Sequence, residues 1–342
     1  MSRRGWVLFT LMSVIWGIPY LFIKIAVEGV SAPVVVFART AAGAALLLPL
    51  ALRAGGFGVL RGRWGWLVLF AAVEMMGPWV LLTDAERHLS SSMAGLLIAA
   101  VPIIAVILGK LTGDRERLGP VRWLGLLVGL AGVALLAAPH LTAEGAWPIV
   151  EVALVAVGYA LGPLITARRL ADVPSLPLTA ACLTLAALVY TPPAILTWPE
   201  TMPPARVLVA LGVLAVVCTA LAFVLFFELV REVGPSRVTV ITYVNPAVAV
   251  AAGVIFLGEP LTASILIAFA LILGGSVLAT TPPPPPPSRP ARLTARSPAP
   301  SRARRTNRRP PDRQPAREGP AAPAERAPVP GPANAGPRRG PE

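Results

Sequence analysis

Three charged residues lie within otherwise apolar segments of the sequence: Arg39, Glu74 and Glu151. A charge in the hydrocarbon interior of a membrane costs about 3 kcal/mol or more unless it faces a cavity or a partner. A carboxyl group in such surroundings binds a proton more readily than one in water, so Glu74 could take up and release protons. The alternative is a static ion pair, Arg39 with Glu74 or with Glu151, that stabilises the packed segments.

A second group of candidates combines aromatic rings, prolines and one amide near the middle of apolar segments. A proline frees the backbone carbonyl one turn before it, and a freed carbonyl can face a ligand. An amide side chain offers both a donor and an acceptor. The candidates to line a substrate cavity are Trp16, Pro19, Tyr20, Trp79, Tyr159, Pro163, Tyr243, Asn245 and Pro246. The alternative interpretation of this group is packing together with helix kinks.

Lys24 and Glu28 stand four residues apart near the end of the first apolar segment. At that spacing two side chains lie on one face of a helix and can form an ion pair. We expect Lys24 to extend its long side chain to the external membrane surface. The alternative is that this pair gates the outer mouth of a substrate pathway.

The elements that position these side chains must be membrane helices. Of the 342 residues 55% are apolar and only 14% are charged, whereas soluble domains carry about 25% charged residues. The apolar blocks are roughly 20 residues long, which spans a hydrocarbon core of about 30 Å. They lack the alternation of barrel strands. We predict an all-α polytopic membrane protein with ten helices, near 6–27, 32–52, 64–86, 91–110, 121–138, 147–167, 175–197, 206–230, 237–257 and 262–280.

The distribution of basic residues predicts the orientation of these helices. With the N-terminus inside, the cytoplasmic helix ends carry 13 Lys and Arg residues, whereas the external ends carry only Lys24, Arg87 and Arg206. Positive charge is enriched on the cytoplasmic side of membrane proteins. We therefore expect a multi-pass protein of the cell membrane with both termini in the cytoplasm.

The first half of the chain is repeated in the second half. A shift of 144 residues aligns scarce prolines and charges: Pro19 with Pro163, Lys24 with Arg168, Glu28 with Asp172, Asp84 with Glu228, and Pro102 with Pro246. Each copy contains five helices, an odd number, so the second copy must be inverted in the membrane. We predict a five-helix repeat at 1–138 and an inverted five-helix repeat at 139–281, an organisation typical of secondary transporters.

The residues after the second repeat differ sharply in composition. Six prolines at 282–287 predict a short polyproline II spacer, and residues 288–342 are rich in Pro, Ala and Arg. This part holds 13 Arg and 4 acidic residues, which is +9 of the chain's net charge of +13. We expect a disordered cytoplasmic tail, 282–342, that obeys the positive-inside distribution, and the alternative is contact with anionic lipid. No motif predicts a specific nucleic-acid partner.

The motifs and their order resemble those of the EamA-type transporters of the drug/metabolite transporter superfamily, over roughly residues 5–280. The segments that carry the resemblance are IWGIPYLFIKIA (15–26), FART (37–40), SSSMAGLLIAAVPIIAVIL (90–108), GLAGVALL (129–136), GPSRVTVITYVNPAVAVAAGVIFLGEPLT (234–262) and LILGGSVLA (271–279). GDRERL (113–118) departs from the family pattern, because Asp-Arg precedes its acid. The resemblance implies a gradient-driven transporter of small metabolites, often an exporter of amino acids or related compounds.

Alternative functions remain open on the sequence alone. A membrane-embedded enzyme acting on a lipid or isoprenoid substrate would need clustered acids or histidines, and Asp84 with Glu86 is the nearest approach. A membrane-tethered binding protein would act through the arginine-rich tail. The chain has no phosphate-binding P-loop, and its two histidines form no metal motif, so we expect no cofactor, no metal and no catalytic residue. The partners expected are a small-molecule substrate, the lipid bilayer and a coupling proton or ion, and the sequence does not predict the oligomeric state.

Overall fold

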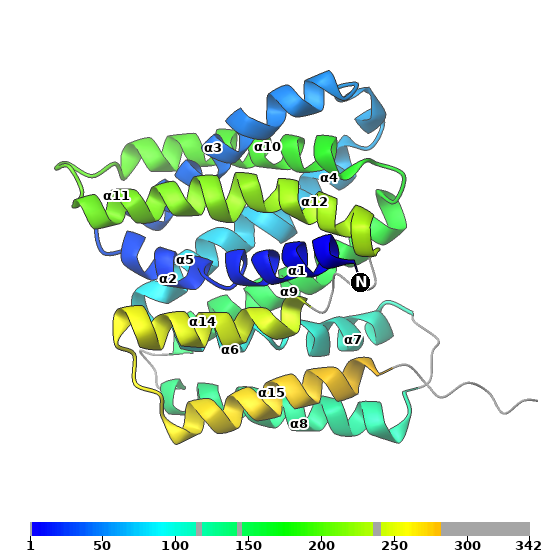
Figure 1. Cartoon of the computed structure of the whole chain (residues 1–342), viewed down its shortest axis with the longest axis vertical. Helices are drawn as coiled ribbons and strands as arrows, with labels where there is room; N and C mark the ends of the chain where they lie inside the picture. The colour runs from blue at the N-terminus through cyan, green and yellow to red at the C-terminus, as the bar shows by residue number, and fades with distance from the viewer. Residues whose placement is uncertain (1, 114–117, 142–145, 235–240, 282–342) are drawn as a thin grey trace, which may run out of the picture. The chain divides into compact units, whose positions relative to one another are not determined.

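A computed structural model describes residues 2–113, 118–141, 146–234 and 241–281, and these residues contain helices and no strands (Figure 1). The helices are α1 (Arg3–Ile15), α2 (Pro19–Ala26), α3 (Ala32–Arg53), α4 (Trp64–Ala71), α5 (Gly77–His88), α6 (Ser91–Ile98), α7 (Val101–Leu111), α8 (Pro120–Ala137), α9 (Ala146–Arg169), α10 (Ser175–Leu196), α11 (Ala205–Gly212), α12 (Ala222–Val233), α14 (Ile241–Leu257) and α15 (Ala263–Thr280). Short 3-10 turns occur at Gly58–Leu60 and Ala138–His140. The predicted tail, 282–342, lies outside the described residues.

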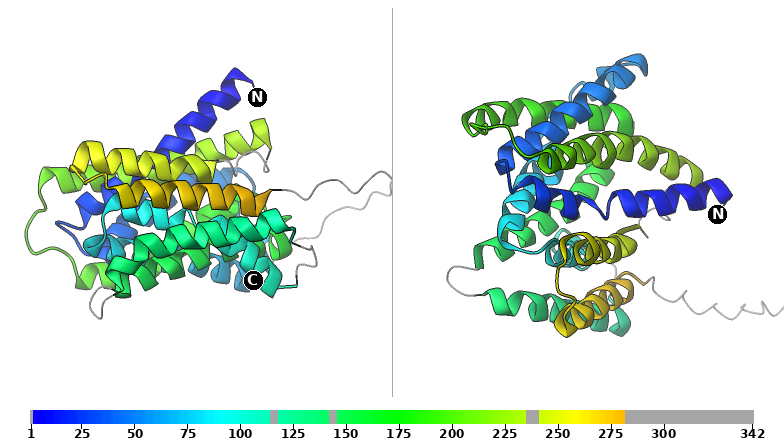
Figure 2. Two further views of the ribbon diagram at one scale, coloured as in Figure 1. Left: turned by 90° about the horizontal axis from the view of Figure 1, so that it is seen from below. Right: turned by 60° about the vertical axis from the view of Figure 1, so that its left-hand side comes forward.

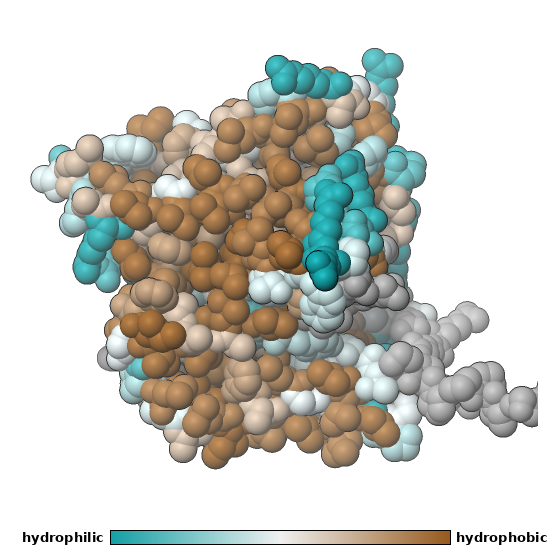
Figure 3. All heavy atoms as spheres, viewed as in Figure 1, coloured by the Kyte–Doolittle hydropathy of each residue, from teal (hydrophilic) through white to brown (hydrophobic). Residues whose placement is uncertain are grey.

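These helices join into ten apolar segments, as the sequence predicts. Within the described ranges nine segments are long and apolar enough to cross a membrane, and the shorter α14 is the tenth apolar helix. The face shown in Figure 3 is dominated by hydrophobic residues along the helices, whereas hydrophilic residues gather toward the helix ends. An apolar outer surface suits contact with lipid, because the hydrocarbon core offers no partners to polar groups.

The first segment is broken in its middle. Helix α1 ends at Ile15 and α2 begins at Pro19, so Trp16, Gly17 and Ile18 form a turn between them. Pro19 has no backbone N–H and occupies the first position of α2, where that donor would have no intrahelical partner. The proline thereby turns a continuous predicted helix into two shorter ones. Pro163 and Pro246, by contrast, lie within the uninterrupted helices α9 and α14.

The third and eighth segments each contain a π-helical stretch. The first stretch, Ala72–Met76, joins α4 to α5, and the second, Val213–Leu221, joins α11 to α12. The 144-residue shift places 72–76 on 216–220, inside the second stretch. The wider turn is rare, and it often occurs near functional sites because it rearranges the backbone hydrogen bonds locally.

The packing of the segments pairs the first half of the chain with the second. Helix α3 packs along α10, α8 along α15, and α6 against α14, so the second, fourth and fifth segments each contact their own repeat mates (Figures 1 and 2). The contact of α5 with α9 has its counterpart in the contact of α1 with α12. Small residues allow the closest of these approaches, since a Cβ on Gly275 would collide with the backbone of Gly129.

Two ion pairs tie the ends of the segments together. Glu28, just after α2, pairs with Arg206 at the start of α11, and Asp172, just after α9, pairs with Arg63 at 2.5 Å. We call these two ends of the helix bundle the Glu28 end (left in Figure 1) and the Asp172 end. The repeat shift relates the acids to each other by 144 residues and the arginines by 143. The two pairs are therefore equivalent contacts at opposite ends.

Candidate functional site

Arg39 of α3 lies in the interior, with 6% of its surface exposed. Its Nε donates a hydrogen bond of 3.3 Å to the Thr219 hydroxyl, and its guanidinium carbon lies 4.2 Å from the centre of the Trp79 ring. Its two terminal nitrogens make no hydrogen bond within the described part of the chain. Arg39 is thus a buried cation that the protein stabilises by an aromatic face and one hydroxyl, with donors left over.

Two tyrosines lie close enough to Arg39 to interact electrostatically with it, Tyr20 of α2 and Tyr159 of α9. Tyr20 is buried, and Tyr159 is half-buried and packs against two separate apolar clusters. Phenolic hydroxyls can donate or accept, so they add adaptable partners beside the arginine. The residues around Arg39 therefore come from the first, second, third, sixth and eighth segments, and both halves of the chain contribute.

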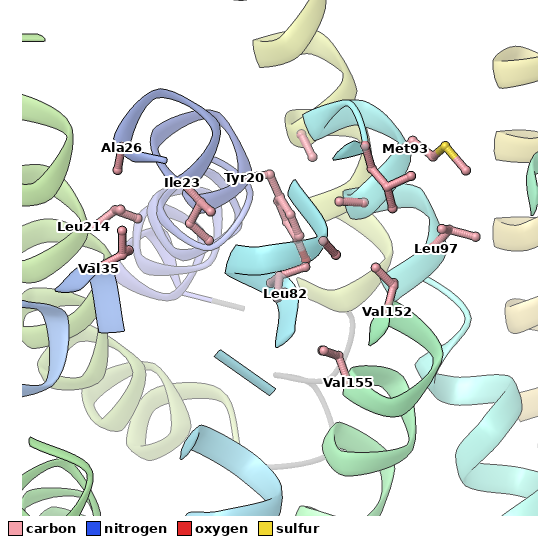
Figure 4. Close-up of a cluster of buried hydrophobic side chains, with 14 of the residues drawn as sticks. Tyr20, Ile23, Ala26, Val35, Leu82, Met93, Leu97, Val152, Val155 and Leu214 are labelled. Carbon is pink, nitrogen blue, oxygen red and sulfur yellow. The ribbon is translucent and has the colours of Figure 1, made fainter. Parts of the chain in front are cut away.

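Two apolar clusters meet at this polar group, since Tyr20 belongs to one of them and Trp79 to the other. The cluster toward the Glu28 end includes Ile23 and Leu82, and Figure 4 shows Tyr20 next to Leu82 among its members. The cluster toward the Asp172 end includes Leu60 and Leu67. Each cluster packs residues from several segments, and Tyr159 contacts both of them.

Glu74 lies in the π-helical stretch Ala72–Met76 and faces Gly162 of α9. A Cβ at position 162 would collide with the Glu74 carboxylate, so only a glycine leaves room for it. One carboxylate oxygen, Oε2, is buried and has no hydrogen-bond partner among the described residues. Tyr159 lies close enough to interact electrostatically with both Glu74 and Arg39.

Glu151 lies in α9 and has 2% of its surface exposed. It neighbours Asp84 of α5 and Trp147, and its Oε2 is buried without a hydrogen-bond partner in the described structure. No ion pair among the described residues joins Arg39 to Glu74 or to Glu151. The static pair considered from the sequence is therefore not formed, and the acids stand apart from the cation.

Lys24 and Glu28 do not pair with each other. Lys24 Nζ donates to the backbone carbonyls of Glu86 at 2.6 Å and Leu89 at 2.8 Å, at the C-terminal end of α5, while Glu28 pairs with Arg206. The last carbonyls of a helix have no intrahelical partners, and a cation there satisfies them. The expectation of an (i, i+4) pair is corrected, because a helix end on another segment offers Lys24 two acceptors.

The remaining members of the aromatic and proline group make other contacts. Trp16 packs against Phe226, with ring centres 4.8 Å apart, and the Tyr243 hydroxyl lies 2.7 Å from the Thr280 hydroxyl. The Asn245 amide, in the orientation that satisfies both of its atoms, donates to the Ser13 carbonyl at 3.1 Å. Trp16 and Asn245 therefore join the first segment to later ones, and Tyr243 joins α14 to α15. Of the nine candidates, the structure brings Tyr20, Trp79 and Tyr159 together around Arg39.

Glu86 of α5 was not among the candidates from the sequence. It is completely buried, and neither of its carboxylate oxygens has a hydrogen-bond partner in the described ranges. Counting residues places it in the last turn of a membrane helix, where an acid is normally solvated. The available signal was its position four residues after Leu82, on a helix face that the core can cover. Among the described residues no group of three or more His, Cys, Asp or Glu could hold a metal ion.

The chain was compared with known proteins. The model of the EamA-like transporter family matches it twice, at residues 3–138 and 146–281. The uncharacterized inner membrane transporter YedA of Escherichia coli K12 is 28% identical over 81% of this chain and 90% of its own length. The uncharacterized transporter YvbV of Bacillus subtilis is 26% identical over 79% of this chain and 90% of its own length.

A solved crystal structure of a protein is also similar to this chain, with a TM-score of 0.60 and 25% identity, over 82% of this chain and 98% of that one. The similarity extends over most of the helical segments of this chain, because it covers 82% of the residues. Together with the two family matches, which cover both halves, this agrees with the ten apolar segments and their pairing. The chain belongs to the EamA-like transporter family and is a multi-pass membrane protein of the drug/metabolite transporter type.

Proposed function

We propose that this protein is a secondary transporter that exports amino acids or related small metabolites across the cell membrane. Membership of a transporter family supports movement of a solute, and the lack of a P-loop in the sequence favours a gradient over ATP as the energy source. Its two termini face the cytoplasm in this proposal, so the Glu28 end is the outer end. The positive-inside distribution of Lys and Arg supports that orientation.

The transport cycle that we propose is alternating access between two inverted repeats, 1–138 and 139–281. The equivalent ion pairs Glu28–Arg206 and Asp172–Arg63 support this symmetry, as do the π-helical stretches at equivalent places. In such a cycle the apolar clusters at the two ends open in turn, and the polar group between them faces one side and then the other. The structure corresponds to a state with both clusters packed.

The observation that carries the substrate assignment is the buried and incompletely satisfied Arg39. A guanidinium with free terminal donors binds a carboxylate in a bidentate manner, and few other groups match that geometry. Tyr20 and Tyr159 supply hydroxyls beside it, and Trp79 supplies an aromatic wall. An amino acid would place its carboxylate on Arg39, with Glu74 and Glu151 as candidates for proton or ion coupling.

The test is exchange of labelled amino acids in vesicles that contain the purified protein. Arg39→Gln should abolish exchange of the amino acids that the wild type accepts, and amines that lack the carboxylate should fail to compete in the wild type. Arg231→Gln is the matched control, because Arg231 is an exposed arginine at a helix end. Equal competition by amino acids and by their decarboxylated amines would contradict the assignment of Arg39.

A further inference from the structure

Glu86 is the most isolated buried acid in the described structure. Its side chain is 0% exposed, and both oxygens lack a hydrogen-bond partner. Glu74 and Glu151 each lack a partner at one oxygen only. An ionised carboxylate buried without hydrogen bonds is strongly disfavoured, and binding a proton removes the charge. Glu86 therefore meets the physical requirement for a proton site more completely than the two acids that the sequence suggested.

The groups that face Glu86 come from four elements. Lys24 and Tyr20 face it from α2, Arg39 from α3, Tyr159 from α9 and Glu259 from the loop between α14 and α15. Lys24 is the nearest strong charge, yet its ammonium donates to the backbone carbonyls of Glu86 and Leu89. The carboxylate itself receives no hydrogen bond from it. Lys24 and Arg39 place positive charge near Glu86, but neither forms an ion pair with its carboxylate within the described residues.

Glu86 also lies close to the turn that joins α5 to α6 at the Glu28 end. Lys24 holds this turn, 89–90, from the side of α2, and Glu259 holds it from the other side. The Glu259 carboxylate accepts from the backbone N–H of Ser91 at 2.7 Å and of Ser92 at 3.0 Å, at the start of α6. Opening the outer end must move this turn relative to α2 or to Glu259, and either movement changes the surroundings of Glu86.

We propose that Glu86 is the carboxyl group that binds the coupling proton, and that it releases or accepts this proton when the outer end opens. With the end closed, the acid holds the proton in an apolar setting. When the end opens, water reaches the carboxyl, which exchanges its proton with that water and is stabilised as an anion by Lys24. The coupling role rests on the proposed transport function, whereas proton binding by Glu86 does not.

Infrared difference spectroscopy of the protein in lipid vesicles tests proton binding directly. On titration from mildly acidic to alkaline pH, we expect the C=O stretching band of a buried carboxylic acid to disappear. Glu86→Gln should remove this titrating band, Glu86→Asp should restore a carboxylic acid band, and the exposed-acid control Glu200→Gln should leave the wild-type band in place. A titrating band that persists unchanged in Glu86→Gln would overturn the proposal, whether or not any amino acid is transported.

A second measurement tests coupling in the same vesicles. An imposed pH gradient should drive net amino-acid movement by the wild type and by the control Glu200→Gln, which changes an exposed acid between α10 and α11. Glu86→Gln should retain amino-acid exchange at equal pH. Its rate of gradient-driven movement should be at least tenfold lower than that of the wild type. Undiminished gradient-driven movement in Glu86→Gln would refute its coupling role. Absence of all amino-acid exchange in the wild type would instead refute the proposed substrate, and the infrared result would stand by itself.

Discussion

The Arg39 guanidinium lies over Trp79, with its central carbon 4.2 Å from the centre of the ring. This contact joins the second segment to the third, and Trp79 lies three residues after Met76, the last residue of the π-helical stretch. A cation over an indole face away from water gains about 2 kcal/mol. The ring can therefore stabilise the buried charge while the terminal nitrogens of Arg39 keep their donors for a substrate carboxylate.

Replacing Trp79 should weaken substrate binding through Arg39. Trp79→Leu removes the aromatic face, and losing roughly 1.4 kcal/mol corresponds to about a tenfold higher half-saturating amino-acid concentration. Trp79→Phe retains a smaller face and should show a clearly smaller change. Concentration-dependent exchange in vesicles measures both variants. Equal effects of the two substitutions would show that the ring acts by volume alone.

Lys24 should contribute more to the free energy of unfolding than the nearby ion pair Glu28–Arg206 does. Lys24→Met leaves two carbonyl acceptors at the end of α5 without their donor, which costs about 2 kcal/mol for groups away from water. Arg206→Met breaks an exposed pair with Glu28, and such pairs contribute about 0–1 kcal/mol. Thermal unfolding in detergent should thus show the larger decrease in midpoint for Lys24→Met. The reverse order would contradict the capping role.

Two adjacent glycines of α15 provide a matched comparison of packing. A Cβ on Gly275 would meet the backbone of Gly129 in α8, whereas a Cβ on Gly274 would meet no atom within 4 Å. Gly275→Ala should destabilise the protein by about 1–3 kcal/mol through forced separation of the helices. Gly274→Ala should be neutral or stabilise by about 0.5–1 kcal/mol, since alanine favours a helix. Unfolding midpoints of the two variants check the contrast.

The ten segments could be predicted because a membrane helix must satisfy its own backbone, which requires long apolar blocks. The site was less accessible to the sequence. Glu86 is two residues before the end of its segment, where an acid is usually solvated, and it is buried because α2, α3 and α9 pack against α5. Tyr20, Trp79 and Tyr159 were identified from their depth, but depth does not say which way a side chain faces. Trp16 and Asn245 have similar depths and join helices instead.

The Lys24–Glu28 prediction shows the same limit at a helix end. Spacing predicts a shared helix face, but α2 ends at Ala26, before Glu28, and spacing carries no information about acceptors on a neighbouring helix. The π-helical stretches are likewise absent from the predicted elements, because no residue pattern distinguishes a π turn from an α turn within an apolar block. Both features arise from packing between segments, which a single sequence specifies only indirectly.

Glu259 should give the outer end a stability that depends on pH in a defined direction. Burial by itself would raise the pKa of Glu259, but the hydrogen bonds from Ser92 and Ser91 outweigh it and hold the pKa below its ordinary value of 4.5. A group whose pKa is lower in the folded state stabilises the fold above its unfolded pKa and loses that contribution as pH falls through the folded pKa.

We therefore expect Glu259→Ala to lower the unfolding midpoint at neutral pH and at pH 5 alike. The difference from the wild type should shrink only at pH values below the ordinary range of carboxyl groups. Glu200→Ala is the control, because Glu200 is an exposed acid between α10 and α11 that makes no hydrogen bond or ion pair within the described ranges. It should show no such pH-dependent difference. A midpoint difference for Glu259→Ala that vanishes already between pH 7 and pH 5 would mean that the carboxylate is not held as an anion at the start of α6.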